Sequence, residues 1–281
     1  MRTSEEMLEL IISVAEQDER IKAAVLGGSR ADAEAPRDIY QDYDVVYYVD
    51  DVAPFWNNMA WIEEKFGRPA VMETPEAMEL PQLPPDGGGQ FIYLMLFEDH
   101  NRIDLTIDPH PFADNGEPAV ALLDKCGFLP ELRPDPGCWH VKRPTEKHFR
   151  DCCSEFWWCL NNVGKGIARD ERPYAMRMFN SIVRDMLDLM TGWYIGVETD
   201  FSASPGKMGK YFKLRLPPDV YTAYLATYSD SEPQNLWRAV FQACGLFRRM
   251  ALEVAQALGF RYELREDENM LAYLRWARSQ G

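Results

Sequence analysis

The segment "LGGSRADAEAPRDIYQDYDVVYYV", from Leu26 to Val49, contains two strand patterns and a polar connection between them. Its last seven residues, YDVVYYV, are β-branched or aromatic except for one aspartate, and such a run predicts a strand. Its first residue ends the apolar run IKAAVL, a second short strand that stops at Gly27 and Gly28. The segment therefore predicts a strand, a glycine-containing turn and another strand.

Two carboxylates, Asp42 and Asp44, stand at the start of the second of these strands. Side chains alternate between the faces of a strand, so both carboxylates are predicted on one face, about 6–7 Å apart. Like charges at this distance repel each other unless a cation neutralises them. Mg²⁺ can do so while keeping positions for water and phosphate oxygens. The alternative is a solvated pair at a strand edge.

A third carboxylate, Asp104, lies in RIDLTI, a further predicted strand that can pack beside the first. Three carboxylates from two strands can hold two metal ions about 4 Å apart, which clamp an in-line phosphoryl displacement. Asp104 can instead be an edge-strand carboxylate that faces solvent. The order of the three aspartates is more specific than any one of them.

The turn Gly27-Gly28-Ser29 precedes the aspartates and opens toward a predicted helix. Such a turn presents backbone N–H groups and a hydroxyl to a phosphate, and Arg30 adds a positive charge. Glycine-serine turns are also common in loops that bind nothing. Only in combination with the carboxylates does the turn indicate a nucleotide.

The rest of the chain predicts an α+β protein in two parts. Thr3 and Glu6 form a capping-box pattern at a first helix, and an amphipathic helix is predicted over 54–67. Two strand patterns, QFIYLMLFE and RIDLTIDP, are spaced as a hairpin, so residues 1–140 predict a mixed sheet with flanking helices. Residues 141–281 predict a helical bundle, from amphipathic patterns at 145–169, 174–196, 216–228 and 233–259.

Composition narrows the classes of function. With 46% hydrophobic residues the 281-residue chain can build a core, and its net charge of −15 argues against nucleic-acid binding. A cationic small molecule suits this charge better, although acidity also serves solubility alone. No apolar run of membrane-spanning length occurs, and the six cysteines show no metal-ligand spacing. We expect a cytoplasmic protein with reduced thiols and no membrane contact.

The core formed by Gly28-Ser29, Asp42, Asp44 and Asp104 resembles the polymerase-β-type nucleotidyltransferase superfamily. In order, GGSRA, QDYDVVYYV, NRIDLTI, ARDERPYAMRMFNSIVRDML, WYIG and GKMGKYFK are similar to motifs of the aminoglycoside 6-adenylyltransferases, which are streptomycin-modifying resistance enzymes. The resemblance implies a nucleotidyltransferase domain over 1–140 and a helical domain over 141–281 that closes on substrate and nucleotide, with the active site between them.

The resemblance also implies a reaction: AMP passes from ATP to an aminoglycoside hydroxyl, with Mg²⁺, as a pair of ions, bound by the three aspartates. Asp104 would ligate the second ion or accept the hydroxyl proton. The nucleotide contacts implied are Gly28, Ser29, Arg30, Arg184, Lys207 and Lys210, and the aminoglycoside contacts are Asp170 and Glu171.

Each of these assignments has a simpler alternative. Lys207 and Lys210 can be solvated loop lysines, and Arg184 can pair with a neighbouring aspartate. Asp170 and Glu171 suit a helix N-terminus, where acidic residues are favoured. The acceptor can be another antibiotic such as a lincosamide, or a protein hydroxyl, and a non-catalytic nucleotide-binding module is a further alternative. A monomer and a homodimer both fit the sequence.

Overall fold

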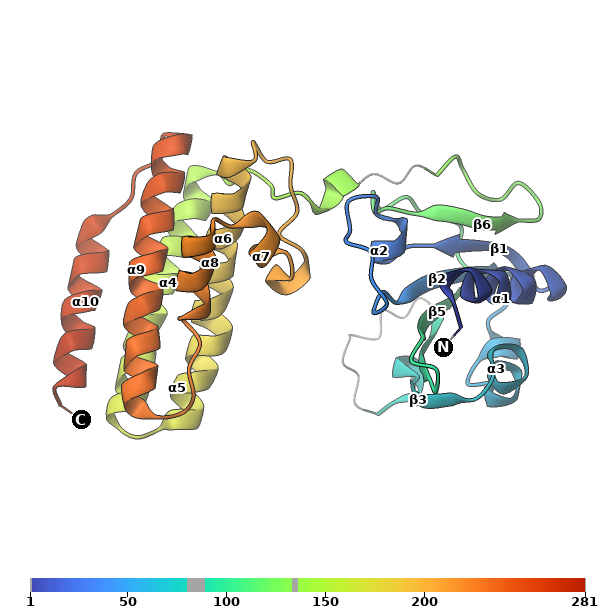
Figure 1. Cartoon of the computed structure of the whole chain (residues 1–281), viewed down its shortest axis with the longest axis horizontal. Coiled ribbons are helices and arrows are strands. Elements are labelled where there is room, and N and C mark those ends of the chain that lie inside the picture. Colours follow the sequence, from blue (N-terminus) through green and yellow to red (C-terminus); the bar gives the residue numbers. More distant parts are fainter. Residues whose placement is uncertain (1, 80–88, 133–135, 281) are drawn as a thin grey trace. The chain divides into compact units, whose positions relative to one another are not determined.

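The computed structural model describes residues 2–79, 89–132 and 136–280. The chain divides into two compact units, Met1–Cys138 and Trp139–Gly281 (Figure 1). The first contains the sheet and the second is built from helices. The predicted α+β class is therefore confirmed.

The N-terminal unit is built on a six-stranded mixed sheet with the strand order β3-β4-β5-β2-β1-β6 (Figure 1). Only β2 and β5 run parallel; the other neighbouring pairs in the described sheet are antiparallel. The predicted hairpin of β4 and β5 is confirmed, whereas the outer strands β3 and β6 were not predicted. The strands are β1 (Ile21–Leu26), β2 (Tyr43–Val49), β3 (Pro69–Glu73), β4 (Phe91–Phe97), β5 (Arg102–Asp108) and β6 (Val120–Asp124).

Helices α1 (Ser4–Gln17) and α3 (Met59–Phe66) contribute to the main core of this unit together with one face of the sheet. On that face lie Tyr43 and Tyr47 of β2 and Ile103 of β5, all fully buried. Strand side chains alternate between faces, so the residues between these project from the opposite face. That second face carries the aspartates of β2 and β5.

The predicted helix over 54–67 is wrong in its first half. Ala53–Phe55 form a separate 3₁₀ turn, and α3 begins only after Asn58. Asn57 has a φ of 47°, which interrupts a right-handed helix, and the Asn58 side chain then accepts a hydrogen bond from the Trp61 N–H. The local capping chemistry therefore overrides the apolar periodicity.

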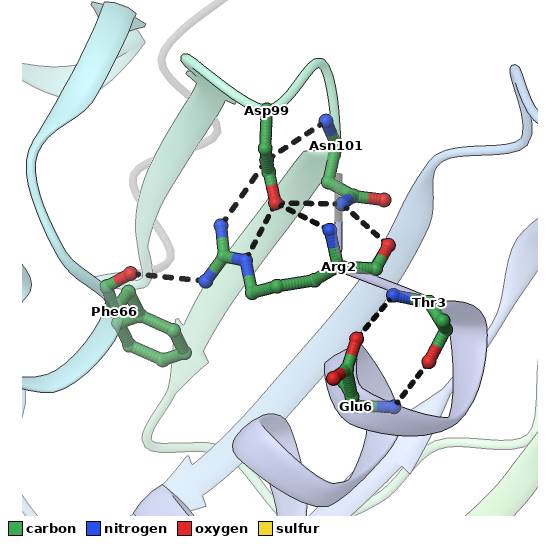
Figure 2. Close-up of polar contacts among 6 residues, drawn as sticks. All are labelled: Arg2, Thr3, Glu6, Phe66, Asp99 and Asn101. Atoms are coloured by element: carbon green, nitrogen blue, oxygen red, sulfur yellow. Dashed lines mark hydrogen bonds and ion pairs between the residues drawn. The ribbon is translucent and has the colours of Figure 1, made fainter.

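The start of the chain is tied to the turn that precedes β5 (Figure 2). The Arg2 guanidinium donates to both oxygens of Asp99, and the Asn101 side-chain amide donates to the Arg2 carbonyl. The Thr3–Glu6 capping box continues this anchor into α1 and confirms the predicted helix start. These contacts fix the N-terminal end of the strand that carries Asp104.

The C-terminal unit is a set of helices that share one core. The four predicted helices are present, but the one over 174–196 contains a π-helical turn, Phe179–Val183, and begins two residues earlier. The last helix was not predicted. The helices are α4 (Glu146–Ala168), α5 (Arg172–Met178), α6 (Arg184–Glu198), α7 (Phe212–Arg215), α8 (Pro218–Leu225), α9 (Pro233–Leu258) and α10 (Leu264–Arg278).

Helix α10 is attached to the bundle by a buried carboxylate. Asp267 is fully buried, forms a two-pronged ion pair with Arg248 of α9, and accepts a hydrogen bond from the Tyr262 hydroxyl. The Trp157 indole N–H of α4 donates in turn to Tyr262. A buried carboxylate is tolerated only when it is paired in this way.

Replacing this carboxylate tests the role of the network. Asp267→Asn is expected to lower the free energy of unfolding of the helical unit by about 3 kcal/mol, because the Arg248 guanidinium loses its charged partner. Urea unfolding followed by far-UV circular dichroism measures the change. Glu268→Gln removes a charge from an exposed position of the same helix and serves as the matched control. Equal stability of the two variants would contradict the prediction.

The Arg2–Asp99 anchor predicts a pH-dependent stability. The guanidinium and the backbone N–H of Arg2, with the amide of Asn101, hold the pKa of Asp99 well below its usual range. Asp99→Asn should lower the free energy of unfolding of the N-terminal unit by about 2 kcal/mol near neutral pH. A depressed pKa stabilises the fold above the unfolded-state value and ceases to do so on acidification.

The difference in the free energy of unfolding between wild type and Asp99→Asn should therefore be constant above about pH 4 and should vanish as the pH falls further. Urea unfolding at a series of pH values measures it. Glu98→Gln, at the neighbouring exposed residue, is the control. A difference in unfolding free energy that persists in acid would show that the stabilisation does not depend on the charge of Asp99.

Candidate functional site

The parallel pairing of β2 with β5 brings the predicted carboxylates together. Asp44 and Asp104 are direct partners in the register of the two strands, so their side chains leave the same face of the sheet. Asp42 precedes β2 by one residue and lies two residues before Asp44. Asp44 and Asp104 thus lie at paired positions of two central strands with Asp42 just before one of them, and both Asp44 and Asp104 are half-buried.

Gly28 lies directly against the Asp44 carboxylate. Its φ is 62°, a left-handed conformation that favours glycine, and a Cβ added there would lie 1.8 Å from Oδ2 of Asp44. The preceding Gly27 N–H donates to the Asp44 carbonyl over 2.8 Å. The glycine turn and the carboxylates are therefore parts of one surface, with no space between them for a side chain.

Ser29 and Arg30, in the short helix α2 (Gly28–Ala31), are held mainly by the segment that enters β2. The Gln41 amide donates to the carbonyl and hydroxyl oxygens of Ser29, at 3.1 and 3.3 Å. The Arg30 guanidinium donates to the carbonyls of Gln41 and Asp42 and lies 3.7 Å from the centre of the Tyr43 ring. Burial lowers the pKa of Arg30. These contacts give Arg30 a supporting role, and its contact with a nucleotide stays a prediction.

The positively charged side chain of Arg102, which was not predicted, lies among the aspartates. Arg102 donates from Nε and Nη2 to the two oxygens of Asp104, each at a distance of 2.7 Å. Its Nη1 lies 3.6 Å from Oδ2 of Asp42. The hydrogen bonds that Arg102 donates to Asp104, and the charges of Asp104, Asp42 and Asp44, raise the pKa of Arg102. The signal was available: Arg102 and Asp104 are two residues apart in a strand and so share a face.

The donor set suits a hard divalent cation, because carboxylate oxygens are the ligands that Mg²⁺ prefers. The guanidinium of Arg102 shows that this face accepts a positive charge. Among the residues that the structure describes, however, no group of three or more His, Cys, Asp or Glu side chains is arranged to hold a metal ion. By donor chemistry the three carboxylates suit a divalent cation, and the Arg102 guanidinium supplies a positive charge between Asp104 and Asp42.

In the helical unit, Arg184 lines a cavity of about 560 Å³. The Arg184 guanidinium donates to the hydroxyl and carbonyl of Thr227 and lies 3.9 Å from the centre of the Tyr228 ring. Arg184 is buried, and it follows the π-helical turn directly. Such turns are rare and often occur at functional sites.

Two carboxylates that were not predicted, Asp185 and Asp188, line the same cavity. Burial raises the pKa of Asp188, and the neighbouring charge of Asp185 adds to this effect. The Tyr224 hydroxyl donates to Asp188 over 2.6 Å. The other lining residues are Asn180, Met208, Tyr228 and Ser229.

Lys207 and Lys210 lie in an exposed loop between α6 and α7. Gly206 and Gly209 have φ angles of 71° and 76°, and a side chain on either would collide with Lys210 or the adjacent aromatic rings. The loop conformation therefore requires its glycines. Exposure leaves both ammonium groups accessible, which is compatible with a phosphate contact and also with simple solvation.

Asp170 and Glu171 lie at the turn between α4 and α5. Asp170 pairs with Arg172 over 2.6 Å and its side chain is 68% exposed. Neither Asp170 nor Glu171 is among the described residues that line the cavity, and Arg184 follows Glu171 by about 20 Å of helical rise at 1.5 Å per residue. The predicted aminoglycoside contacts and the predicted Arg184 site are therefore not brought together.

Comparisons with known proteins agree on one family. A family model described as streptomycin adenylyltransferase matches residues 1–276. Similar curated proteins are the aminoglycoside 6-adenylyltransferases of Bacillus subtilis, 38% identical over 93% of this chain and 93% of that protein, and of Campylobacter jejuni, 34% identical over 95% and 93%. The corresponding protein of Staphylococcus aureus is 32% identical over 93% of this chain and 94% of its own.

A crystal structure of an aminoglycoside 6-adenyltransferase from Bacillus subtilis matches 99% of both chains with 35% identity and a TM-score of 0.49.

Among the described residues, no helix combines the length and apolar character needed to cross a bilayer. On the family match over nearly its whole length, and on identities above 30% to three relatives, the chain belongs to the streptomycin adenylyltransferase family and is a nucleotidyltransferase.

Proposed function

We propose that this protein transfers AMP from ATP to a hydroxyl of an aminoglycoside, the 6-hydroxyl of streptomycin, and thereby confers resistance to the antibiotic. The attacking hydroxyl oxygen forms a bond to the α-phosphorus, and the bond to the departing pyrophosphate breaks. The hydroxyl proton passes to a carboxylate of the site. The family match and the names of the relatives support the class of donor and acceptor.

The observation that carries the proposal is the contact of the glycine turn with Asp44 beside Asp104. The three carboxylates would hold Mg²⁺, in an arrangement that two ions could share. When bound, Mg²⁺ supplies charge neutralisation for the triphosphate and lowers the pKa of the acceptor hydroxyl. The protein contributes chiefly by positioning, since phosphoryl transfer requires little covalent chemistry from side chains.

In the N-terminal unit the proposed nucleotide contacts are Gly28 and Ser29. Gly28 and Ser29 offer backbone N–H groups and a hydroxyl to the phosphates, and the absence of a side chain at Gly28 lets the turn lie directly against the Asp44 carboxylate. In the helical unit, Lys207 and Lys210 supply exposed positive charges. An acidic protein needs such local cations to bind an anionic triphosphate.

The acceptor contacts are assigned to acidic side chains of the helical unit. Asp185 and Asp188 line a cavity beside the Tyr228 ring, and a guanidinium or ammonium group bound there would offset the cost of burying Asp188 in its charged form. Asp170 and Glu171 remain candidates for a more exposed contact. Because aminoglycosides carry several positive charges, more than one acidic site can contribute.

The reaction itself is tested by measuring pyrophosphate release from ATP and Mg²⁺ in the presence of streptomycin. Asp104→Asn should reduce the rate about a thousandfold, because a metal ligand or proton acceptor is lost. Asp108→Asn, four residues further along the same strand, is the matched control and should retain activity. Release that needs no aminoglycoside, or that Asp104→Asn leaves unchanged, would overturn the proposal. Release with a lincosamide or a protein acceptor alone would keep the nucleotidyltransferase and replace the acceptor.

The glycine turn gives a second prediction. Gly28→Ala should reduce the rate about a hundredfold, because the added methyl group displaces the Asp44 carboxylate. Gly67→Ala provides the matched control: Gly67 also has a positive φ, 88°, but no atom lies within 4 Å of a Cβ there. Both variants carry backbone strain and only one perturbs a carboxylate. Equal losses of activity would mean that strain, not the contact with Asp44, is responsible.

A further inference from the structure

We propose that Arg102 is an internal counter-ion of the three aspartates, and that a divalent metal ion must displace its guanidinium in order to bind. Arg102 then sets the metal affinity of the site by competition. This inference rests on the proposed metal-dependent function, and it concerns a residue that the carboxylate pattern does not include.

The geometry of the ion pair carries the inference. Arg102 engages both oxygens of Asp104 at 2.7 Å and reaches toward Asp42 at 3.6 Å, so one guanidinium spans two of the three carboxylates. The two-pronged arrangement is the strong form of a carboxylate–guanidinium contact. Three carboxylates at neighbouring strand positions would otherwise repel one another.

Metal binding and this contact exclude each other. A metal ion ligated by Asp104 needs at least one of the two oxygens to which Arg102 now donates. The guanidinium stays charged at every physiological pH, so it cannot leave by losing its proton. A metal and a guanidinium at one carboxylate also repel each other, and therefore the side chain must swing away.

The surroundings of Arg102 allow that movement. Its backbone is fixed, because Arg102 is paired with Leu96 across the β4–β5 hairpin. Its side chain is 44% exposed, whereas that of Asp104 is 20% exposed. The guanidinium can thus turn into solvent without disturbing the strand or the carboxylate. The exchange needs only a change of side-chain rotamer.

The competing interpretation is a purely structural ion pair, in which Arg102 stabilises the sheet and has no bearing on the metal. The two interpretations differ in metal affinity. If Arg102 competes, removing it takes a cation away from the carboxylates and strengthens metal binding. If the pair is only structural, its removal lowers the stability of the unit and leaves the affinity unchanged or weaker.

The test is a titration of the full chain with Mn²⁺, a spectroscopic substitute for Mg²⁺, without ATP or aminoglycoside. Free Mn²⁺ is counted by electron paramagnetic resonance. Arg102→Gln should lower the dissociation constant of the first ion about tenfold, the effect that one neighbouring charge typically has on a carboxylate. Arg68→Gln, which removes a charge at an exposed position outside the site, is the control and should match wild type.

Two further variants make the result specific. Arg102→Lys keeps the charge but loses the two-pronged fit, so its affinity should lie between those of wild type and Arg102→Gln. It also carries the test if Arg102→Gln does not fold. In the background Asp104→Asn, the substitution Arg102→Gln should bring little gain, because the competition takes place at Asp104.

Arg102→Gln with wild-type or weaker affinity for Mn²⁺ would overturn the competition while leaving the proposed function intact. An equal gain in Arg68→Gln would reduce the effect to general electrostatics and overturn it as well. Failure of every variant, including wild type, to bind Mn²⁺ would reject the metal site and the inference together. The release of pyrophosphate then decides separately whether the enzyme acts on an aminoglycoside.

Discussion

The parallel alignment of β2 with β5 is the constraint on which the N-terminal unit depends. Parallel neighbours cannot be joined by a tight turn, so the chain must make a long excursion between them. Here α3, β3 and β4 provide it, and β4 returns to β5 as an antiparallel hairpin. Only this register sets Asp44 opposite Asp104 while the alternate residues Tyr43 and Ile103 fill the core.

The second consequence of this register is electrostatic. Carboxylates on adjacent strands raise one another's energy, and a fold that keeps them side by side must supply a positive charge. Arg102 does so from the same face of the same strand as Asp104. Arg30 has different partners, since its guanidinium donates hydrogen bonds to backbone carbonyls and lies over an aromatic ring. The two arginines thus have different partners: Arg102 binds carboxylates, and Arg30 binds the backbone and an aromatic ring.

In the helical unit a π-helical turn determines which side chains line the cavity. The π-helical turn Phe179–Val183 adds residues to one turn of a helical path and so changes the direction of the side chains that follow. Arg184, Asp185 and Asp188 come directly after it and line one cavity. Elsewhere in the bundle the buried Asp267 is paired with Arg248 and holds α10 in place.

From the sequence alone, the strand at 43–49, the hairpin, the capping box of α1, the helical C-terminal half and the three aspartates could be predicted. These features depend on local periodicity, capping and motif order, which neighbouring residues encode. Tertiary structure alone decided the outer strands β3 and β6, the π-helical turn, the contact of Gly28 with Asp44 and the approach of Arg102 to Asp42. Each of these depends on which strand or helix lies beside another, and distances between segments far apart in the chain leave no local signal.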